Sequence, residues 1–173
     1  CSSDLHAMLR HERAHYQPAR PIQTVIIGDG PERDHLQRRA HELGIEHEVF
    51  FFGHRDDVYG IYPLFDCFVQ PSQSEGLSYA LLEALAFGLP VVVSHDQQRH
   101  EVIVHGEHGM VVPARNGGDG VQQALLNLLL NPDQCISIKD KNIALVQNDF
   151  ARSMMVTQYH ARYTQLCTRS GAG

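Results

Sequence analysis

The chain has 173 residues, enough for about one domain with a real hydrophobic core. Hydrophobic residues make up 43% and charged residues 20%, which is globular composition and argues against a disordered chain. The net charge of -6 argues against a general nucleic-acid surface, because such domains tend to be basic. Four widely spaced cysteines without a CxxC pair argue against a zinc ribbon and suit a reducing cytosol. The 12 histidines include no HExxH motif, so we expect surface histidines and no metal.

No stretch of the sequence approaches the roughly 18 uninterrupted apolar residues of a membrane span. The N-terminal residues are charged and contain no apolar core of a signal peptide. We therefore expect no transmembrane segment and a cytoplasmic location, and leave open peripheral contact with the inner membrane through a missing half of the protein. The chain begins at Cys1 rather than Met, which predicts a fragment of something longer.

Short β-branched runs alternate with helical patterns along the chain, which predicts strands connected by helices. Prolines and glycines punctuate these segments, and Gly44 is the expected C-cap of the first long helix. The predicted strands are Gln23–Ile27, His47–Gly53, Phe65–Ser72, Leu89–Ser94 and Gly109–Pro113. The predicted helices are Asp4–His15, Glu32–Gly44, Asp57–Pro63, Leu77–Phe87, Asp119–Leu130, Asp133–Asn148 and Ser153–Thr168.

This alternation predicts an α/β fold: a Rossmann-like, open, mostly parallel sheet with helices on both faces. In such folds the ligand crevice lies beyond the carboxyl ends of the strands. Three turns fall at that edge, namely Gly28–Pro31, Gly53–Asp57 and Pro71–Ser78. We expect these turns to form one site.

Two carboxylates flank the start of the apolar helix. Every residue of Leu77–Phe87 except Ser78 and Glu83 is apolar or aromatic, which predicts a helix buried on all sides. A buried carboxylate needs a partner, and Glu83 leans back toward the crevice beside Glu75 because helical side chains tilt toward the N-terminus. Two interpretations stay open: a ligand with phosphate and vicinal hydroxyls, or pairing of Glu83 with an internal arginine or backbone amide.

The glycine turns are weaker signals. Gly28 and Gly30 form a strand–GxG–helix turn in which Arg33 replaces the third glycine of a dinucleotide fingerprint. This turn is either an anion cradle at a helix N-terminus or turn geometry alone. Gly76 and Ser78 allow close approach of a phosphate or a sugar oxygen, and Ser78 could equally be only an N-cap.

The stretch PSQSEGLSYALLEALAFGLPVVVS resembles the E-x7-E signature of retaining GT-B glycosyltransferases of the group-1, or family-four, class. Glu75 and Glu83 match its two acidic positions. The resemblance extends through VIIGDGPERDHLQRRAHELGIEHEVFFFGHRDDV before it and EVIVHGEHGMVVPARN after it. It is strong over about Val25 to Leu130 and looser over the C-terminal helices. Several motifs in the right order are more specific than any one of them.

The resemblance implies one half of a GT-B fold: a donor-binding domain over residues 1–150, a crossover helix over 151–168 and a flexible tail over 169–173. It implies glycosyl transfer from a UDP- or GDP-linked sugar to a saccharide or lipid-linked acceptor in polysaccharide or glycoconjugate biosynthesis. The acceptor would be held by an N-terminal domain that this chain lacks. No cofactor or metal is implied.

The resemblance also implies roles for individual residues. Glu75 would be catalytic at the donor sugar, backbone N–H groups from Leu77 to Tyr79 would bind the diphosphate, and Glu83 would accept from the ribose hydroxyls. The implied donor-binding residues are Gly28, Gly30, His54, Gly76, Leu77, Ser78, Tyr79, Leu82 and Glu83.

The chain departs from the family pattern at its start. The family's first strand of this half, with an arginine and a lysine that clamp the diphosphate, has no counterpart before Asp4. Arg55, Arg99 or a missing partner segment would have to substitute. We therefore expect this polypeptide alone to be inactive or nearly so. Two alternatives remain: a sugar-nucleotide epimerase of similar fold, or a non-catalytic nucleotide-sugar-binding module.

Overall fold

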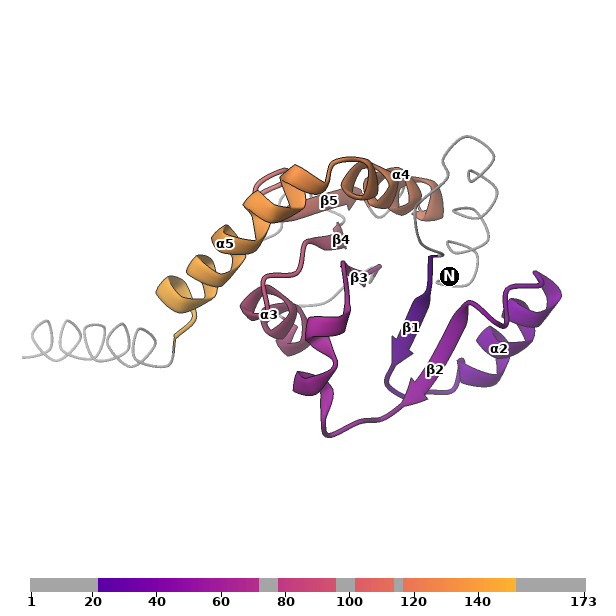
Figure 1. Cartoon of the computed structure of the whole chain (residues 1–173). Coiled ribbons are helices and arrows are strands. Elements are labelled where there is room, and N and C mark those ends of the chain that lie inside the picture. The colour runs from indigo at the N-terminus through magenta and orange to yellow at the C-terminus, as the bar shows by residue number, and fades with distance from the viewer. Residues whose placement is uncertain (1–21, 72–77, 96–101, 114–116, 152–173) are drawn as a thin grey trace, which may run out of the picture.

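The computed structural model describes residues 22–71, 78–95, 102–113 and 117–151 (Figure 1). Its strands are β1 (Thr24–Ile27), β2 (Val49–Gly53), β3 (Phe68–Gln70), β4 (Val91–His95) and β5 (Gly109–Pro113). Its helices are α2 (Arg33–Glu42), α3 (Tyr79–Ala86), α4 (Gly117–Leu130) and α5 (Pro132–Asp149), with two 3₁₀ turns, η1 (Val58–Gly60) and η2 (Tyr62–Leu64). The helices predicted at Asp4–His15 and Ser153–Thr168 lie outside the described residues.

All described strands are parallel to their neighbours. β1 pairs with β2, and β3, β4 and β5 pair in that order, so the strands form two parallel sets. Parallel strands need crossover connections, and α2 supplies the one from β1 to β2 and α3 the one from β3 to β4. The predicted class, α/β with parallel strands and flanking helices, is confirmed.

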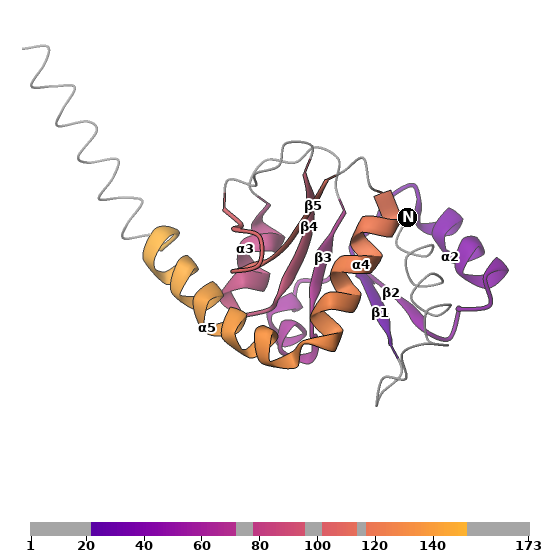
Figure 2. The ribbon, with the colours of Figure 1, turned by 90° about the horizontal axis from the view of Figure 1, so that it is seen from above.

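The valines of β4 explain how helices cover both faces of the three-stranded set. Successive side chains of a strand point to opposite faces. Val91 and Val93 pack in one cluster with residues of α3, whereas Val92 packs in another with residues of α4. Figure 2 shows α3 and α4 on either side of these strands. The uninterrupted valine run therefore reflects a strand buried on both faces, as is usual in parallel sheets.

A Schellman motif ends helix α3 and turns the chain toward β4. Gly88 has φ 75°, a conformation that side chains disfavour. Its N–H donates to the carbonyl of Leu85 at 2.9 Å, and the N–H of Leu89 donates to the carbonyl of Ala84 at 3.0 Å. Gly44 ends α2 with the same pattern at φ 64°, next to a C-cap at Leu43. The sequence prediction placed this stop one residue too late.

The structure refines or corrects the predictions for three segments. The short helix predicted over Asp57–Pro63 is present as two consecutive 3₁₀ turns, η1 and η2. The buried strand predicted over Phe65–Ser72 is reduced to three half-buried residues in β3. Burial of α3 on all sides is also wrong: its core contacts come from Leu81, Ala84 and Leu85, while Tyr79 is 84% exposed. The helix packs against the sheet and against α5, and the remaining residues, Tyr79, Ala80 and Ala86, are exposed.

Asn142 of α5 joins two segments that flank β4 and β5. Its side chain is fully buried, and Nδ2 donates to the carbonyl of Leu89 at 2.8 Å and to that of His108 at 2.9 Å. Oδ1 has no hydrogen-bond partner among the described residues. His108 is also buried, and its Nδ1 accepts from the N–H of Val104 at 3.1 Å. These polar contacts tie α5 to the segments that immediately precede the parallel strands β4 and β5.

Within the ranges that the structure describes, no helix is long and apolar enough to cross a membrane.

Candidate functional site

The carboxylate of Glu83 has two partners in the chain. The hydroxyl of Tyr59 donates to Oε1 at 2.9 Å, and the hydroxyl of Tyr62 donates to Oε2 at 3.0 Å. The alternative of an arginine or a backbone amide as partner is therefore replaced by a pair of phenols. Tyr59 lies in η1 and Tyr62 in η2, the consecutive 3₁₀ turns that follow β2, so the fold brings these turns against α3.

The two tyrosines differ in their surroundings. Tyr62 is 6% exposed, and its ring stacks on Phe87 with centroids 5.2 Å apart and planes 17° apart. Tyr59 is 57% exposed, and its ring is 6.4 Å from that of Phe87 at 30°. Burial, together with the Glu83 carboxylate, raises the pKa of the Tyr62 hydroxyl far above its usual value. The hydrogen bond to Glu83 also raises the pKa of Tyr59. Both phenols therefore stay protonated donors at neutral pH.

The N-terminal part of α3 carries three further residues of the predicted site, Ser78, Tyr79 and Leu82. Ser78 is the N-cap residue, but its side chain makes no capping hydrogen bond. The first N–H groups of a helix have no partner inside it, and the helix dipole favours negative charge there. Tyr79 is exposed, whereas Leu82 is half-buried against the core cluster on the α3 side. This helix start is therefore chemically suited to an anion.

The Gly28–Gly30 turn is joined to the turn after β2. The N–H of Gly28 donates to the carbonyl of Gly53 at 2.8 Å. The N–H of Gly30 donates to Oδ1 of Asp29 at 3.0 Å, and Arg33 Nη1 lies 3.6 Å from the same oxygen. Gly28 has φ 117°, and a Cβ added at either glycine would meet open space. Both N–H groups are thus used within the chain, while the space above the turn remains accessible.

The turn after β2 places His54 and Arg55 at the surface. The Arg55 guanidinium forms a bidentate pair with Asp57, at 2.7 and 2.5 Å, and lies 5.7 Å from the centroid of the Phe52 ring. This pairing lowers the pKa of the Asp57 carboxyl and raises that of Arg55. The His54 side chain is 80% exposed and lies 3.4 Å from Asp56. Arg55, considered as a substitute for the family's cationic clamp, is therefore already engaged by a carboxylate.

Several predicted site residues lie outside the described residues, namely Glu75, Gly76, Leu77 and Arg99. Sequence reasoning missed Tyr59 and Tyr62. Their spacing carried a usable signal, because side chains three residues apart fall on the same side of a 3₁₀ segment. Nothing in the spacing identified Glu83 as their partner, because it follows them by 24 and 21 residues.

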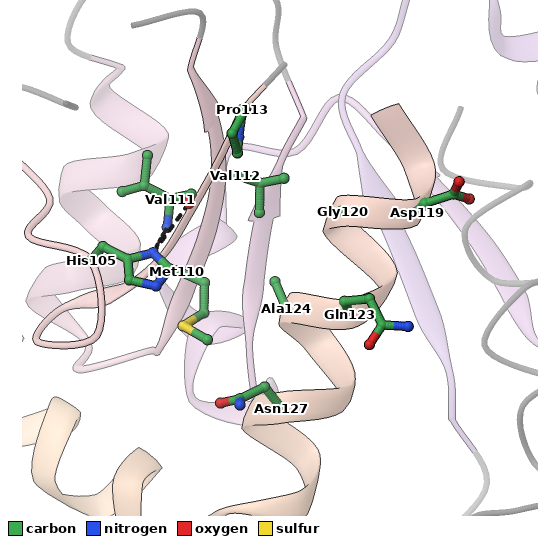
Figure 3. A pocket seen from close by; sticks show the side chains of 10 residues that line it. All are labelled: His105, Met110, Val111, Val112, Pro113, Asp119, Gly120, Gln123, Ala124 and Asn127. Atoms are coloured by element: carbon green, nitrogen blue, oxygen red, sulfur yellow. Dashed lines mark hydrogen bonds between the residues drawn. The ribbon is translucent and has the colours of Figure 1, made fainter. Parts of the chain in front are cut away.

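A pocket of about 750 Å³ lies elsewhere, between β5 and α4 (Figure 3). Nδ1 of His105 is 3.1 Å from both the N and the O of Val111, so it accepts from the N–H or donates to the carbonyl according to its tautomer. The other lining residues are Met110, Val112, Pro113, Asp119, Gly120, Gln123, Ala124 and Asn127. None of them belongs to the predicted site. We regard the Glu83 cluster as the better candidate, because two phenols converge there on one carboxylate.

Across the part of the chain that is described, no three His, Cys, Asp or Glu side chains are grouped to hold a metal ion.

Known proteins resemble this chain in sequence. An uncharacterized glycosyltransferase of Haemophilus influenzae is 31% identical over 136 residues, covering 78% of this chain and 38% of that protein. A GDP-mannose-dependent alpha-(1-6)-phosphatidylinositol monomannoside mannosyltransferase of Mycobacterium tuberculosis is 32% identical over 123 residues, covering 66% and 32%. The chain thus spans between about a third and two fifths of the length of these curated relatives.

Solved structures share the fold. Anabaena Alr3699/HepE in complex with UDP matches with a TM-score of 0.77 at 19% identity, over 93% of this chain and 44% of that chain. The C-terminal domain of the group 1 glycosyl transferase LpcC from Francisella tularensis matches with a TM-score of 0.70 at 20% identity, over 86% and 77%. These matches place the α/β fold among GT-B glycosyltransferase structures. The family model for glycosyl transferases group 1 matches residues 9–144. The chain therefore belongs to the glycosyl transferases group 1 family.

Proposed function

We propose that this chain is the donor-binding domain of a retaining glycosyltransferase that uses a UDP- or GDP-linked sugar. The observation that carries the proposal is the Glu83 carboxylate, which two phenols hold in the middle of α3, a helix whose start has no side-chain cap. A carboxylate accepts hydrogen bonds from vicinal hydroxyls, and a helix N-terminus attracts phosphate. A nucleoside diphosphate presents both groups.

The relatives support this choice of ligand. The structure of Anabaena HepE contains UDP, and the mycobacterial relative is named as dependent on GDP-mannose. In our proposal Glu83 accepts from the ribose hydroxyls, and the N–H groups from Leu77 to Tyr79 bind the diphosphate. Glu75 contacts the donor sugar. The relatives described above are named as transferases, which gives the epimerase alternative no support.

The reaction needs groups from beyond this chain. An N-terminal domain would hold the saccharide or lipid-linked acceptor, and cationic groups would stabilise the negative charge that develops on the departing diphosphate. Arg55 is paired with Asp57, so it is a poor candidate for that clamp. We therefore propose that the isolated polypeptide binds nucleotide without catalysing transfer at an appreciable rate.

Calorimetry with UDP, GDP and their sugar conjugates tests this function. Glu83→Gln keeps the volume of the side chain but removes its charge, and should weaken nucleotide binding about tenfold or more, the value of a hydrogen bond to a charged group. Glu75→Gln should weaken binding of the sugar conjugate more than that of the free diphosphate. Glu42→Gln, on the exposed side of α2, is the matched control. Equal affinities of wild type and Glu83→Gln would refute the site.

A further inference from the structure

We propose that the two tyrosines that donate to Glu83, Tyr59 and Tyr62, have different roles in nucleotide binding. Tyr62 is a positioning residue that fixes Oε2, whereas Tyr59 is an exchangeable partner whose place on Oε1 is taken by a ribose hydroxyl. This inference rests on the proposed function, in which Glu83 binds the ribose. It concerns how the carboxylate is prepared for that contact and which of its oxygens the ligand uses.

Tyr62 is held too firmly to leave the carboxylate. Its ring lies in the core cluster with Leu81 and Leu85 and stacks on Phe87 at 5.2 Å. Its hydroxyl has one proton and two acceptors in reach, Glu83 Oε2 at 3.0 Å and the carbonyl of Ala80 at 3.3 Å. The carboxylate is nearer and charged, so it takes the proton. Tyr62 therefore sets the rotamer of Glu83 before any ligand arrives.

The surroundings of Tyr59 allow a ligand hydroxyl to replace its hydroxyl on Oε1. More than half of its surface is exposed, and its ring meets Phe87 only at 6.4 Å. It lies in η1, a single 3₁₀ turn of three residues. A phenol that leaves Oε1 gains hydrogen bonds to water at once, so its displacement costs little. The same displacement from Tyr62 would leave a buried hydroxyl with only the longer contact, 3.3 Å, to the carbonyl of Ala80.

Access to the carboxylate, rather than its acceptor capacity, explains why one phenol must yield. An ionised carboxylate offers about four lone-pair sites, and these two phenols use two of them. A ribose brings two vicinal hydroxyls that need well-directed acceptors, and Tyr59 covers one oxygen from the exposed side. Rigid positioning on one oxygen combined with easy exchange on the other gives a prepared carboxylate that is still accessible.

Matched Tyr→Phe substitutions test this division. Calorimetry measures the affinity of the full chain for UDP and GDP and for their 2′-deoxy counterparts. The readout is the ratio of the ribo to the deoxy affinity. This ratio does not change when a variant merely unfolds in part, because both affinities come from the same sample. Tyr62→Phe should lower the UDP or GDP affinity about fivefold to tenfold and bring the ratio toward one. Tyr59→Phe should keep the ratio or raise it, with affinity equal to wild type or up to about fivefold tighter.

Glu83→Gln provides the reference for a site without ribose discrimination. In that background Tyr62→Phe should not change the ratio any further, as expected for a residue that acts only through Glu83. A Tyr62→Phe variant with the wild-type ratio would overturn the positioning role. A Tyr59→Phe variant whose ratio falls toward one would overturn the exchange. If wild type binds neither UDP nor GDP, or binds them no better than the deoxy forms, the proposed function itself fails.

Discussion

Replacing Asn142 by alanine should destabilise the fold severely, although this residue is far from any catalytic group in the sequence. Its Nδ2 donates two hydrogen bonds, of 2.8 and 2.9 Å, to the carbonyls of Leu89 and His108. A buried carbonyl that loses its donor costs about 1–3 kcal/mol, so two of them cost about 2–6 kcal/mol. Removal of Oδ1 offsets part of this cost, because this atom is itself an unsatisfied acceptor among the described residues. We therefore expect a net loss of about 2–4 kcal/mol.

Urea unfolding followed by circular dichroism measures this loss as a change in midpoint at constant slope. Asn148→Ala is the matched control, since Asn148 lies on the same helix but is exposed; it should change the free energy of unfolding by less than about 0.5 kcal/mol. If Asn142→Ala costs no more than its control, the polar link from α5 to the sheet connections does not stabilise the fold, and our assignment of the amide nitrogen is wrong.

Two further predictions concern the connection between β4 and β5. Gly109→Ala should lower the free energy of unfolding by about 3 kcal/mol or more, because a Cβ there would lie 2.8 Å from the Val91 nitrogen and closer still to the Val91 carbonyl oxygen. A Gly109→Ala protein with wild-type thermal stability would contradict this close approach. Burial lowers the pKa of His108 below its usual 6.5, so the unfolded chain binds a proton before the folded one does, and stability should fall as pH drops below about 6.5. His108→Asn, which keeps an acceptor near the Nδ1 position, should flatten the acid side of the stability curve, and an unchanged curve would refute the assignment.

Local patterns in the sequence predicted much of the fold. The strand Gly109–Pro113 has the predicted bounds, since glycine and proline mark both of its ends. The helix stop near Gly44 was predictable because a left-handed C-terminal conformation favours glycine. The lengths of β3 and of the segment before it were not predictable, because they depend on pairing with β4 and on packing against α3 rather than on local propensity.

The candidate site was predictable only in part. The position of Glu83 within α3 followed from helix periodicity and the family resemblance. Its partners did not, because Tyr59 and Tyr62 meet it only through tertiary packing. The expectation of a helix buried all round failed for a related reason. The apolar residues Ala80 and Ala86 suggest a core position in the sequence, but both are exposed, because the helix packs against the sheet and α5 through its other residues.

The contact between His105 and β5 affects whether copies of this protein can aggregate through the edge of the sheet. β5 ends the described three-stranded set, so its outer backbone groups could pair with a strand of another molecule and start aggregation. The imidazole of His105 lies against the N and O of Val111, in the middle of that edge. An incoming strand would have to displace the ring before it could form a continuous ladder. The His105 ring thus covers the middle of this edge, while the backbone of the same residue bridges Gly109 at its start and Pro113, which has no N–H, ends the strand.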